Sequence, residues 1–156
     1  MKNIPSGPEK IKARETVFRL LKLRPRSEHE IRQKLEKKEF SHDIIDETIQ
    51  YLKHIQLIDD RRFAKAWIHS RLARPFGLNR IRFELKTKGI NNQIIQEELS
   101  GAKETFAEDE AVLALAQRRF QKYKRVEKLK AKRRTFEFLV RRGFSSDAIS
   151  KALRQL

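Results

Sequence analysis

The side chains best suited to a chemical role are lysines and arginines, which gather in two stretches of the chain. The first stretch runs from Gln117 to Arg134 and carries ten basic residues against one acid, Glu127. A surface that is merely solvated usually mixes both signs of charge, so this excess predicts binding to phosphate or to an acidic protein surface. The candidates here are Arg118, Arg119, Lys122, Lys124, Arg125, Lys132, Arg133 and Arg134, followed by Arg141 and Arg142.

A second cationic set lies on both sides of the Pro75–Gly77 turn. Its candidates are Arg71, Arg74, Arg80, Arg82 and Lys88, of which the first three are nearest the turn. Phe76 is expected to be the exposed ring of this region. The other aromatic residues recur at helical spacing, Trp67 and Phe83 among them, and are interpreted as core rather than as base-stacking groups.

The sequence contains no arrangement of residues typical of an active site. The four histidines have no partner at metal-ligand or triad spacing, and there is no glycine-rich phosphate loop. The carboxylates are scattered among basic residues, unlike the clustered acids that hold metal ions in nucleases. We therefore expect a binding protein rather than an enzyme, with no metal and no cofactor. The histidines concerned are His29, His42, His54 and His69.

Composition narrows the class of partner. The 156 residues carry a net charge of +16, which makes a polyanion the natural partner. The charge is +2 over residues 1–12, +2 over 13–58, +4 over 59–107 and +8 over 108–156.

Cysteine is absent, which fits a reducing compartment. The longest apolar run, Ala111–Ala116, is too short to span a membrane, and the first twelve residues lack the apolar stretch of a signal peptide, so we expect a cytoplasmic protein.

The chain repeats itself about every 50 residues. The pattern from Arg24 to Ile49 recurs from Arg74 to Leu99, displaced by 50 positions. A third copy survives in the last 20 residues, displaced by a further 54 positions. Such repeats bury their apolar faces against one another, which predicts an all-α, elongated tandem array of three three-helix repeats.

Apolar spacing and capping residues place the helices within each repeat. Residues 1–10 are expected to be a flexible tail, followed by repeats over 11–58, 59–105 and 106–156. The predicted helices are 10–24, 28–38 and 42–56; 60–73, 78–88 and 92–100; and 108–125, 129–142 and 146–155.

Several predicted helix ends carry residues that are suited to capping a helix or to forming the turn that follows it. Ser27 and Glu30 form a predicted capping box, and Ser41, Asn91 and Ser145 are predicted to cap the third helix of each repeat. The carboxylates of Asp59 and Asp60 suit the start of the fourth helix. Gly89 and Gly143 follow the second helices of their repeats, where a left-handed residue is favourable, whereas repeat 1 has Glu39, so we expect a different turn there.

Three stretches of the chain form a specific combination. The first runs from Arg26 to Leu35, the second from Leu57 to Ala64 and on to Ile90, and the third from Arg141 to Ser145 with Ile149 behind it. Taken together, in this order and spacing, they resemble the RecX family of bacterial regulators of the RecA recombinase. The resemblance covers nearly the whole chain, from about Ala13 to Leu156.

The resemblance implies tandem three-helix repeats that bind in the groove of the RecA filament on single-stranded DNA. It further implies inhibition of the ATPase, strand-exchange and coprotease activities, together with direct binding to single-stranded and double-stranded DNA. The lysine-rich stretch Lys122–Lys132 is unusual for the family. No self-complementary surface is evident, so we expect a monomer without membrane contact.

Two other functions fit the same residues. The first is a helical DNA-binding or architectural protein that acts without a recombinase, in which Asn91, Asn92 and Gln93 would read base edges. Helix capping is the simpler role for Asn91, because serines hold the matching positions of the other repeats. The second is a structural scaffold that binds an acidic protein; such a scaffold would itself bind little DNA directly.

Overall fold

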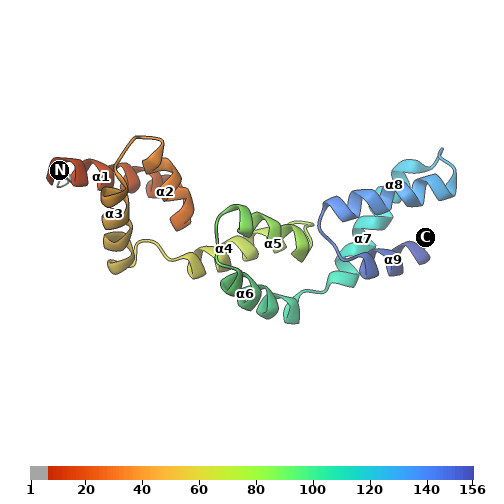
Figure 1. The fold of residues 1–156 in the computed structure, drawn as a ribbon. Helices are drawn as coiled ribbons and strands as arrows, with labels where there is room; N and C mark the ends of the chain where they lie inside the picture. Colours follow the sequence, from red (N-terminus) through yellow and green to blue (C-terminus); the bar gives the residue numbers. More distant parts are fainter. Residues whose placement is uncertain (1–6) are drawn as a thin grey trace.

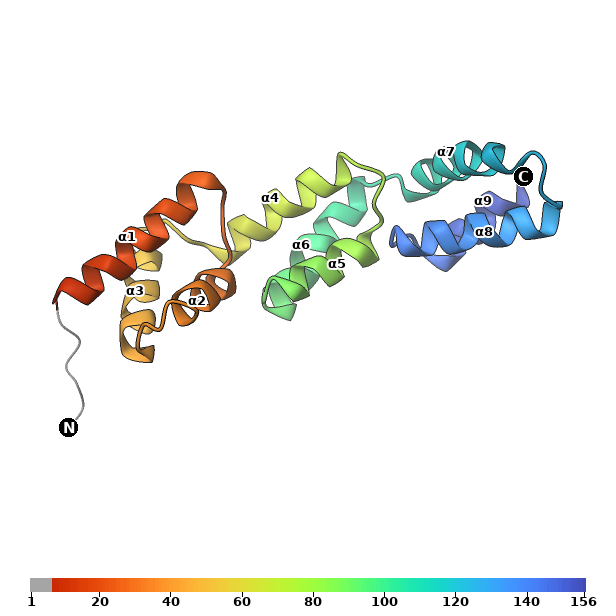
Figure 2. The ribbon, with the colours of Figure 1, turned by 90° about the horizontal axis from the view of Figure 1, so that it is seen from above.

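The fold is an elongated array of helices. A computed structural model describes residues 7–156, and every regular element in that range is helical. The helices form three groups that follow one another along a line (Figures 1 and 2). Repeat 1 contains α1 (Gly7–Leu23), α2 (Glu28–Glu36) and α3 (His42–His54); repeat 2 contains α4 (Asp60–Leu72), α5 (Leu78–Thr87) and α6 (Asn92–Thr105); repeat 3 contains α7 (Glu108–Phe120), the short 3₁₀ helix η1 (Gln121–Tyr123), α8 (Lys128–Arg141) and α9 (Ser146–Arg154).

Each repeat has its own apolar core. Ile31 and Leu35 of α2 are fully buried in the first core, and Ile81 and Leu85 of α5 take the same places in the second. In the third core Leu139 matches Leu85. Among residues 7–156 the buried apolar side chains form three separate clusters, one per repeat, so the repeats are joined by other contacts.

The predicted helix ends are close to the observed ones, with three corrections. Helix α1 begins at Gly7, so residues 7–10 are helical rather than part of a tail; Pro8 and Glu9 suit a first helical turn, and Lys10 pairs with Glu47 of α3 at 2.7 Å. Residues 1–6 of the predicted tail lie outside the described part of the chain. Helix α6 continues to Thr105 because Ala102 still packs on the core. Helix α7 ends at Phe120, where η1 begins the reversal toward α8.

The predicted caps are confirmed. Ser27 and Glu30 form the full capping box, and the side chains of Ser41, Asn91 and Ser145 accept backbone N–H groups at the starts of α3, α6 and α9. Asp59 accepts the N–H of Arg62 at 2.9 Å and opens α4. These local hydrogen bonds fix where the third helix of each repeat begins.

The turn after the second helix has the same backbone in all three repeats. Gly89 and Gly143 have φ of 72° and 85°, and Glu39 has φ of 61°. The expectation of a different turn at Glu39 is therefore wrong. In each repeat the residue after the left-handed one donates its N–H to the carbonyl of Leu35, Leu85 or Leu139.

These turns also join the repeats. The turn of repeat 2 lies on the start of α2, where the Ser27 hydroxyl donates to the Lys88 carbonyl at 2.7 Å. The turn of repeat 3 lies on the start of α5, where the Gly77 N–H donates to the Arg142 carbonyl at 2.8 Å and the Asn79 N–H to the Gly143 carbonyl at 3.1 Å. Within residues 7–156 no hydrogen bond joins the turn at Glu39 to another repeat, which fits the presence of a side chain there.

Candidate functional site

The most organised cationic surface of the described chain is a series of positive side chains stacked against aromatic rings across repeats 2 and 3. We call it the cation–aromatic ladder. Each cation lies 4.5–5.8 Å from a ring centroid, within the range of a cation–π interaction. In order along the surface, its members are Lys88, Trp67, Arg71, Phe76, Arg80, Arg142, Phe138, Arg119, Tyr123 and Arg134.

Helices α4 and α5 position the repeat 2 part of the ladder. The guanidinium of Arg71 lies 4.5 Å from the Trp67 ring centroid, and the Lys88 ammonium lies 5.0 Å from the same ring. Trp67 itself is stacked on the buried Phe63 at 5.7 Å, so the indole is held by the core on one side. The core of repeat 2 thereby fixes the ring that orients two of the predicted cations.

One carboxylate organises the cations of this part. Glu84 of α5 accepts hydrogen bonds from Trp67 Nε1 at 2.9 Å and from Arg71 Nε at 2.7 Å through one oxygen. Its other oxygen accepts a hydrogen bond from Arg80 Nε at 3.1 Å. Arg71 and Arg80 therefore share a single negative charge, and their group retains a net positive charge.

Phe76 connects the two halves of the ladder. Its ring centroid lies 5.6 Å from the Arg71 guanidinium, 4.9 Å from that of Arg80 and 5.1 Å from that of Arg142. Arg142 comes from repeat 3, so this one ring gathers cations from both sides of the joint. The prediction that Phe76 is an exposed ring needs correction, because these three arginines leave it half-buried.

Helices α7 and α8 continue the ladder through repeat 3. Phe138 lies between Arg142 and Arg119, at 5.2 Å and 4.5 Å from their guanidinium carbons. Tyr123 lies 5.5 Å from Arg119 and 5.8 Å from Arg134. Figure 2 shows α7 and α8 lying side by side in the C-terminal part of the array.

The structure brings six of the predicted cations into the ladder and leaves nine outside it. The six are Arg71, Arg80, Lys88, Arg119, Arg134 and Arg142. Lys132 is half-buried and donates to the Leu153 carbonyl at the end of α9, and Arg133 pairs with Glu137 at 3.1 Å. The remaining seven are exposed: Arg74, Arg82, Arg118, Lys122, Lys124, Arg125 and Arg141.

The aromatic rings of the ladder, and the Glu84 carboxylate that holds its cations, were not predicted as functional residues. The sequence does contain a usable signal, since ladder partners on one helix or at its C-terminal cap recur four positions apart. Examples are Trp67 with Arg71 and Phe138 with Arg142. Phe83, by contrast, was interpreted as core and is 70 % exposed, because it lies on the face of α5 opposite Ile81.

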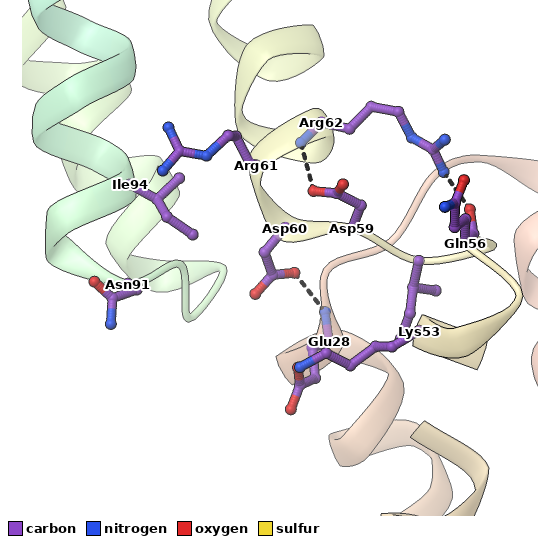
Figure 3. A pocket seen from close by; sticks show the side chains of 10 residues that line it. Glu28, Lys53, Gln56, Asp59, Asp60, Arg61, Arg62, Asn91 and Ile94 are labelled. Atoms are coloured by element: carbon purple, nitrogen blue, oxygen red, sulfur yellow. Dashed lines mark hydrogen bonds and ion pairs between the residues drawn. The ribbon is translucent and has the colours of Figure 1, made fainter. Parts of the chain in front are cut away.

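A separate pocket of about 670 Å³ lies between repeats 1 and 2 (Figure 3). Its lining mixes the acids Glu28, Asp59 and Asp60 with the bases Lys53, Arg61 and Arg62. The figure shows the Asp60 carboxylate accepting the Glu28 N–H, at 2.9 Å. Burial raises the pKa of Asp60, while that hydrogen bond opposes the rise. The mixed charges make this pocket part of the joint rather than a second cationic surface.

Glu30 links the ladder to repeat 1. Its carboxylate accepts Lys88 Nζ at 2.6 Å and Arg24 Nη2 at 2.8 Å. Burial by itself raises the pKa of Glu30, but the hydrogen bonds from Arg24 and Lys88 outweigh it and lower the pKa to about 2. Glu30 is therefore ionised at neutral pH and holds Lys88 at the repeat 1–2 joint.

Within residues 7–156 no helix is long and apolar enough to cross a membrane. In the same range no group of three or more histidine and acidic side chains is placed to hold a metal ion. The separate cores, the docked turns and the ladder define the class: a tandem three-helix repeat protein with a cationic face.

Comparison with known proteins identifies the family. Family models for the first, second and third three-helix domains of RecX match residues 13–52, 59–99 and 107–153. The chain belongs to the RecX family of regulatory proteins.

Individual relatives agree with this assignment. A regulatory protein RecX from Chlorobium phaeobacteroides (strain BS1) is 38% identical over 93% of each chain. One from Clostridium perfringens (strain 13 / Type A) is 31% identical over all of this chain and 74% of the relative. The crystal structure of RecX from Lactobacillus salivarius has the same fold, with a TM-score of 0.83 at 22% identity over 97% of this chain and 98% of that one.

Proposed function

We propose that this protein is a negative regulator of the RecA recombinase. It binds the RecA filament on single-stranded DNA and inhibits the ATPase, strand-exchange and coprotease activities of the filament. It acts as a cytoplasmic monomer without membrane contact and also binds single-stranded and double-stranded DNA. Family membership supports the regulatory role, and the observation that carries the mode of binding is the cation–aromatic ladder.

The ladder suits a long polyanionic partner for a geometric reason. It crosses the joint between repeats 2 and 3, so its cations form one surface instead of two separate patches. A filament presents DNA phosphate and acidic protein groups over several subunits, and many weak contacts along one body add up through effective concentration. Exposed cations beside the ladder, such as Arg74 and Arg141, extend the surface.

The test is the single-stranded-DNA-dependent ATPase of the cognate RecA, titrated with this protein below stoichiometry. The salt concentration is chosen so that the protein no longer binds bare DNA, because phosphate contacts weaken steeply with salt. We expect inhibition under these conditions. No effect on the ATPase, with DNA binding still measurable at low salt, would instead indicate a DNA-binding protein that acts without a recombinase.

A pair of charge-reversal variants locates the surface. Arg74→Glu with Arg141→Glu changes two exposed cations beside the ladder, whereas Arg71 is unsuitable because it holds Glu84. The matched control, Lys34→Glu with Lys37→Glu, makes the same change of net charge on exposed positions of repeat 1. We expect the concentration that half-inhibits the RecA ATPase to rise at least about ten-fold over the wild type in the first variant, and less than about three-fold in the control. Equal losses would mean that only net charge matters.

A further inference from the structure

The exposed face of α5 carries an aromatic ring between two cations, separate from the ladder. Phe83 is 70 % exposed, and Asn79, Arg82 and Lys86 beside it are exposed as well. Asn79, the adjacent pair Arg82 and Phe83, and Lys86 occupy three successive turns along one side of α5, away from the buried Ile81 and Leu85. We call this set the α5 stripe.

The α5 stripe has a one-sided charge. Neither Arg82 nor Lys86 forms an ion pair within the described part of the chain, whereas the cations on the neighbouring face of α5 are paired through Glu84 and Glu30. The one acid of α5, Glu84, is engaged by Trp67, Arg71 and Arg80. The ring of Phe83 therefore lies between two positive charges that no carboxylate offsets.

A single nucleic-acid strand fits this arrangement better than an acidic protein surface does. An exposed ring offers a flat face on which any base can stack, and cations on each side bind the flanking phosphates. Arg82 and Lys86 are four residues apart, about 6 Å along the helix axis, with the ring next to Arg82. Double-stranded DNA would not offer an unstacked base to such a ring.

We propose that the α5 stripe is a base-stacking site for single-stranded nucleic acid, with Phe83 contacting a base and Arg82 and Lys86 contacting phosphates. The inference rests on the DNA-contacting part of the proposed function and specifies a residue for it. Its two kinds of contact are separable, because stacking responds to the presence of bases and phosphate binding responds to salt.

The experiment compares binding of an oligo-dT strand with binding of an abasic deoxyribose-phosphate strand of equal length. The wild-type protein is expected to prefer oligo-dT. Phe83→Leu keeps an apolar side chain but removes the ring, so we expect it to weaken oligo-dT binding about five-fold or more without changing abasic binding. Phe83→Tyr restores a ring and retains the preference. Leu23→Ala, which truncates an apolar side chain 78 % exposed in repeat 1, serves as the control and leaves both affinities unchanged.

A salt titration tests the cations. Arg82→Gln is expected to lower the salt slope of oligo-dT binding by about 0.7, and Phe83→Leu is expected to leave the slope unchanged. An unaltered preference for oligo-dT in Phe83→Leu overturns the proposal, as does binding of neither strand by the wild-type protein. Loss of RecA inhibition in Phe83→Leu with the base preference intact also overturns it, because the ring would then contact protein.

The strand-binding and salt measurements use no RecA, so they test the stacking site independently of the proposed regulatory function. A base preference that depends on Phe83, found together with an unaffected RecA ATPase, would reject the proposed regulatory function and retain the stacking site.

Discussion

Glu39 adopts a backbone conformation that the other two repeats give to glycine. Its φ of 61° places a residue with a Cβ in the left-handed region, at a cost of about 1 kcal/mol. Gly89 has the same conformation, but a Cβ there would also lie 2.4 Å from the Cβ of His29 in repeat 1. Both positions carry the free-energy cost of a left-handed backbone, but only a side chain at Gly89 would also collide with the neighbouring repeat. Comparing them therefore separates these two contributions.

Glu39→Gly is expected to stabilise the protein by about 0.5–1 kcal/mol, because glycine removes the left-handed penalty. Gly89→Ala is expected to destabilise it by more than about 2 kcal/mol, because strain and the contact with His29 add together. Urea unfolding followed by circular dichroism measures both changes. Glu39→Ala keeps the penalty while removing the carboxylate, and an equal stabilisation by Ala and Gly would assign the effect to charge instead of to the backbone.

At the scale of the element, one short turn serves two purposes. It ends the second helix of a repeat, and in repeats 2 and 3 its carbonyls accept hydrogen bonds from the second helix of the repeat before. Gly77, the N-cap of α5, has an ordinary φ of −86°. A Cβ at this position would nevertheless lie 2.3 Å from the Gly143 carbonyl oxygen, so glycine is required here by the neighbouring repeat.

Gly77→Ala is expected to open the joint between repeats 2 and 3 while the three cores stay folded. We expect a larger radius of gyration in small-angle X-ray scattering, unchanged helix content, and a stability loss of roughly 1–3 kcal/mol from overpacking. Gly101→Ala is the matched control: it lies inside α6 with open space around it, and should stabilise the helix by about 0.5–1 kcal/mol. An unchanged radius in Gly77→Ala would show that the joint adjusts to a methyl group.

At the scale of the whole molecule, the two joints differ in the bonds that close them. The joint between repeats 2 and 3 is closed by backbone hydrogen bonds and by Phe76. The joint between repeats 1 and 2 relies on the side chains of Ser27, Glu30 and Asp60, and has the pocket of Figure 3 beside it. We therefore expect the angle between repeats 1 and 2 to respond more readily to pH and to substitution.

The pH response follows from Glu30. Its pKa in the folded protein is lowered to about 2 from an ordinary value of 4.5. A lowered carboxyl pKa contributes stability that is present above pH 4.5 and is lost as the pH falls toward 2. We expect the repeat 1–2 joint to loosen over that range, and Glu30→Gln to loosen it already at pH 7.

Fluorescence energy transfer between dyes on repeats 1 and 2 measures this opening. The chain has no cysteine, so two introduced cysteines direct the dyes. Circular dichroism on the same samples separates joint opening from helix loss. A transfer efficiency in Glu30→Gln equal to that of the wild type at pH 7 would contradict the role given to Glu30.

The helices, their order and most of their ends follow from local sequence. Capping at Ser27, Ser41 and Ser145 depends on residues within one turn, and the apolar period is read over a few residues, so neither needs tertiary information. The repeat itself predicts three similar units and an elongated array. The two basic stretches likewise predict that the ligand is anionic.

What only the tertiary structure decided is how those cations are arranged. Phe76 and Arg142 are far apart in the chain and meet because the turn of repeat 3 docks on the start of α5. That contact buries part of a ring expected to be exposed, while Phe83, interpreted as core, faces solvent. Sequence periodicity records which residues share a helix face, but the docking of one repeat on the next determines which faces are covered.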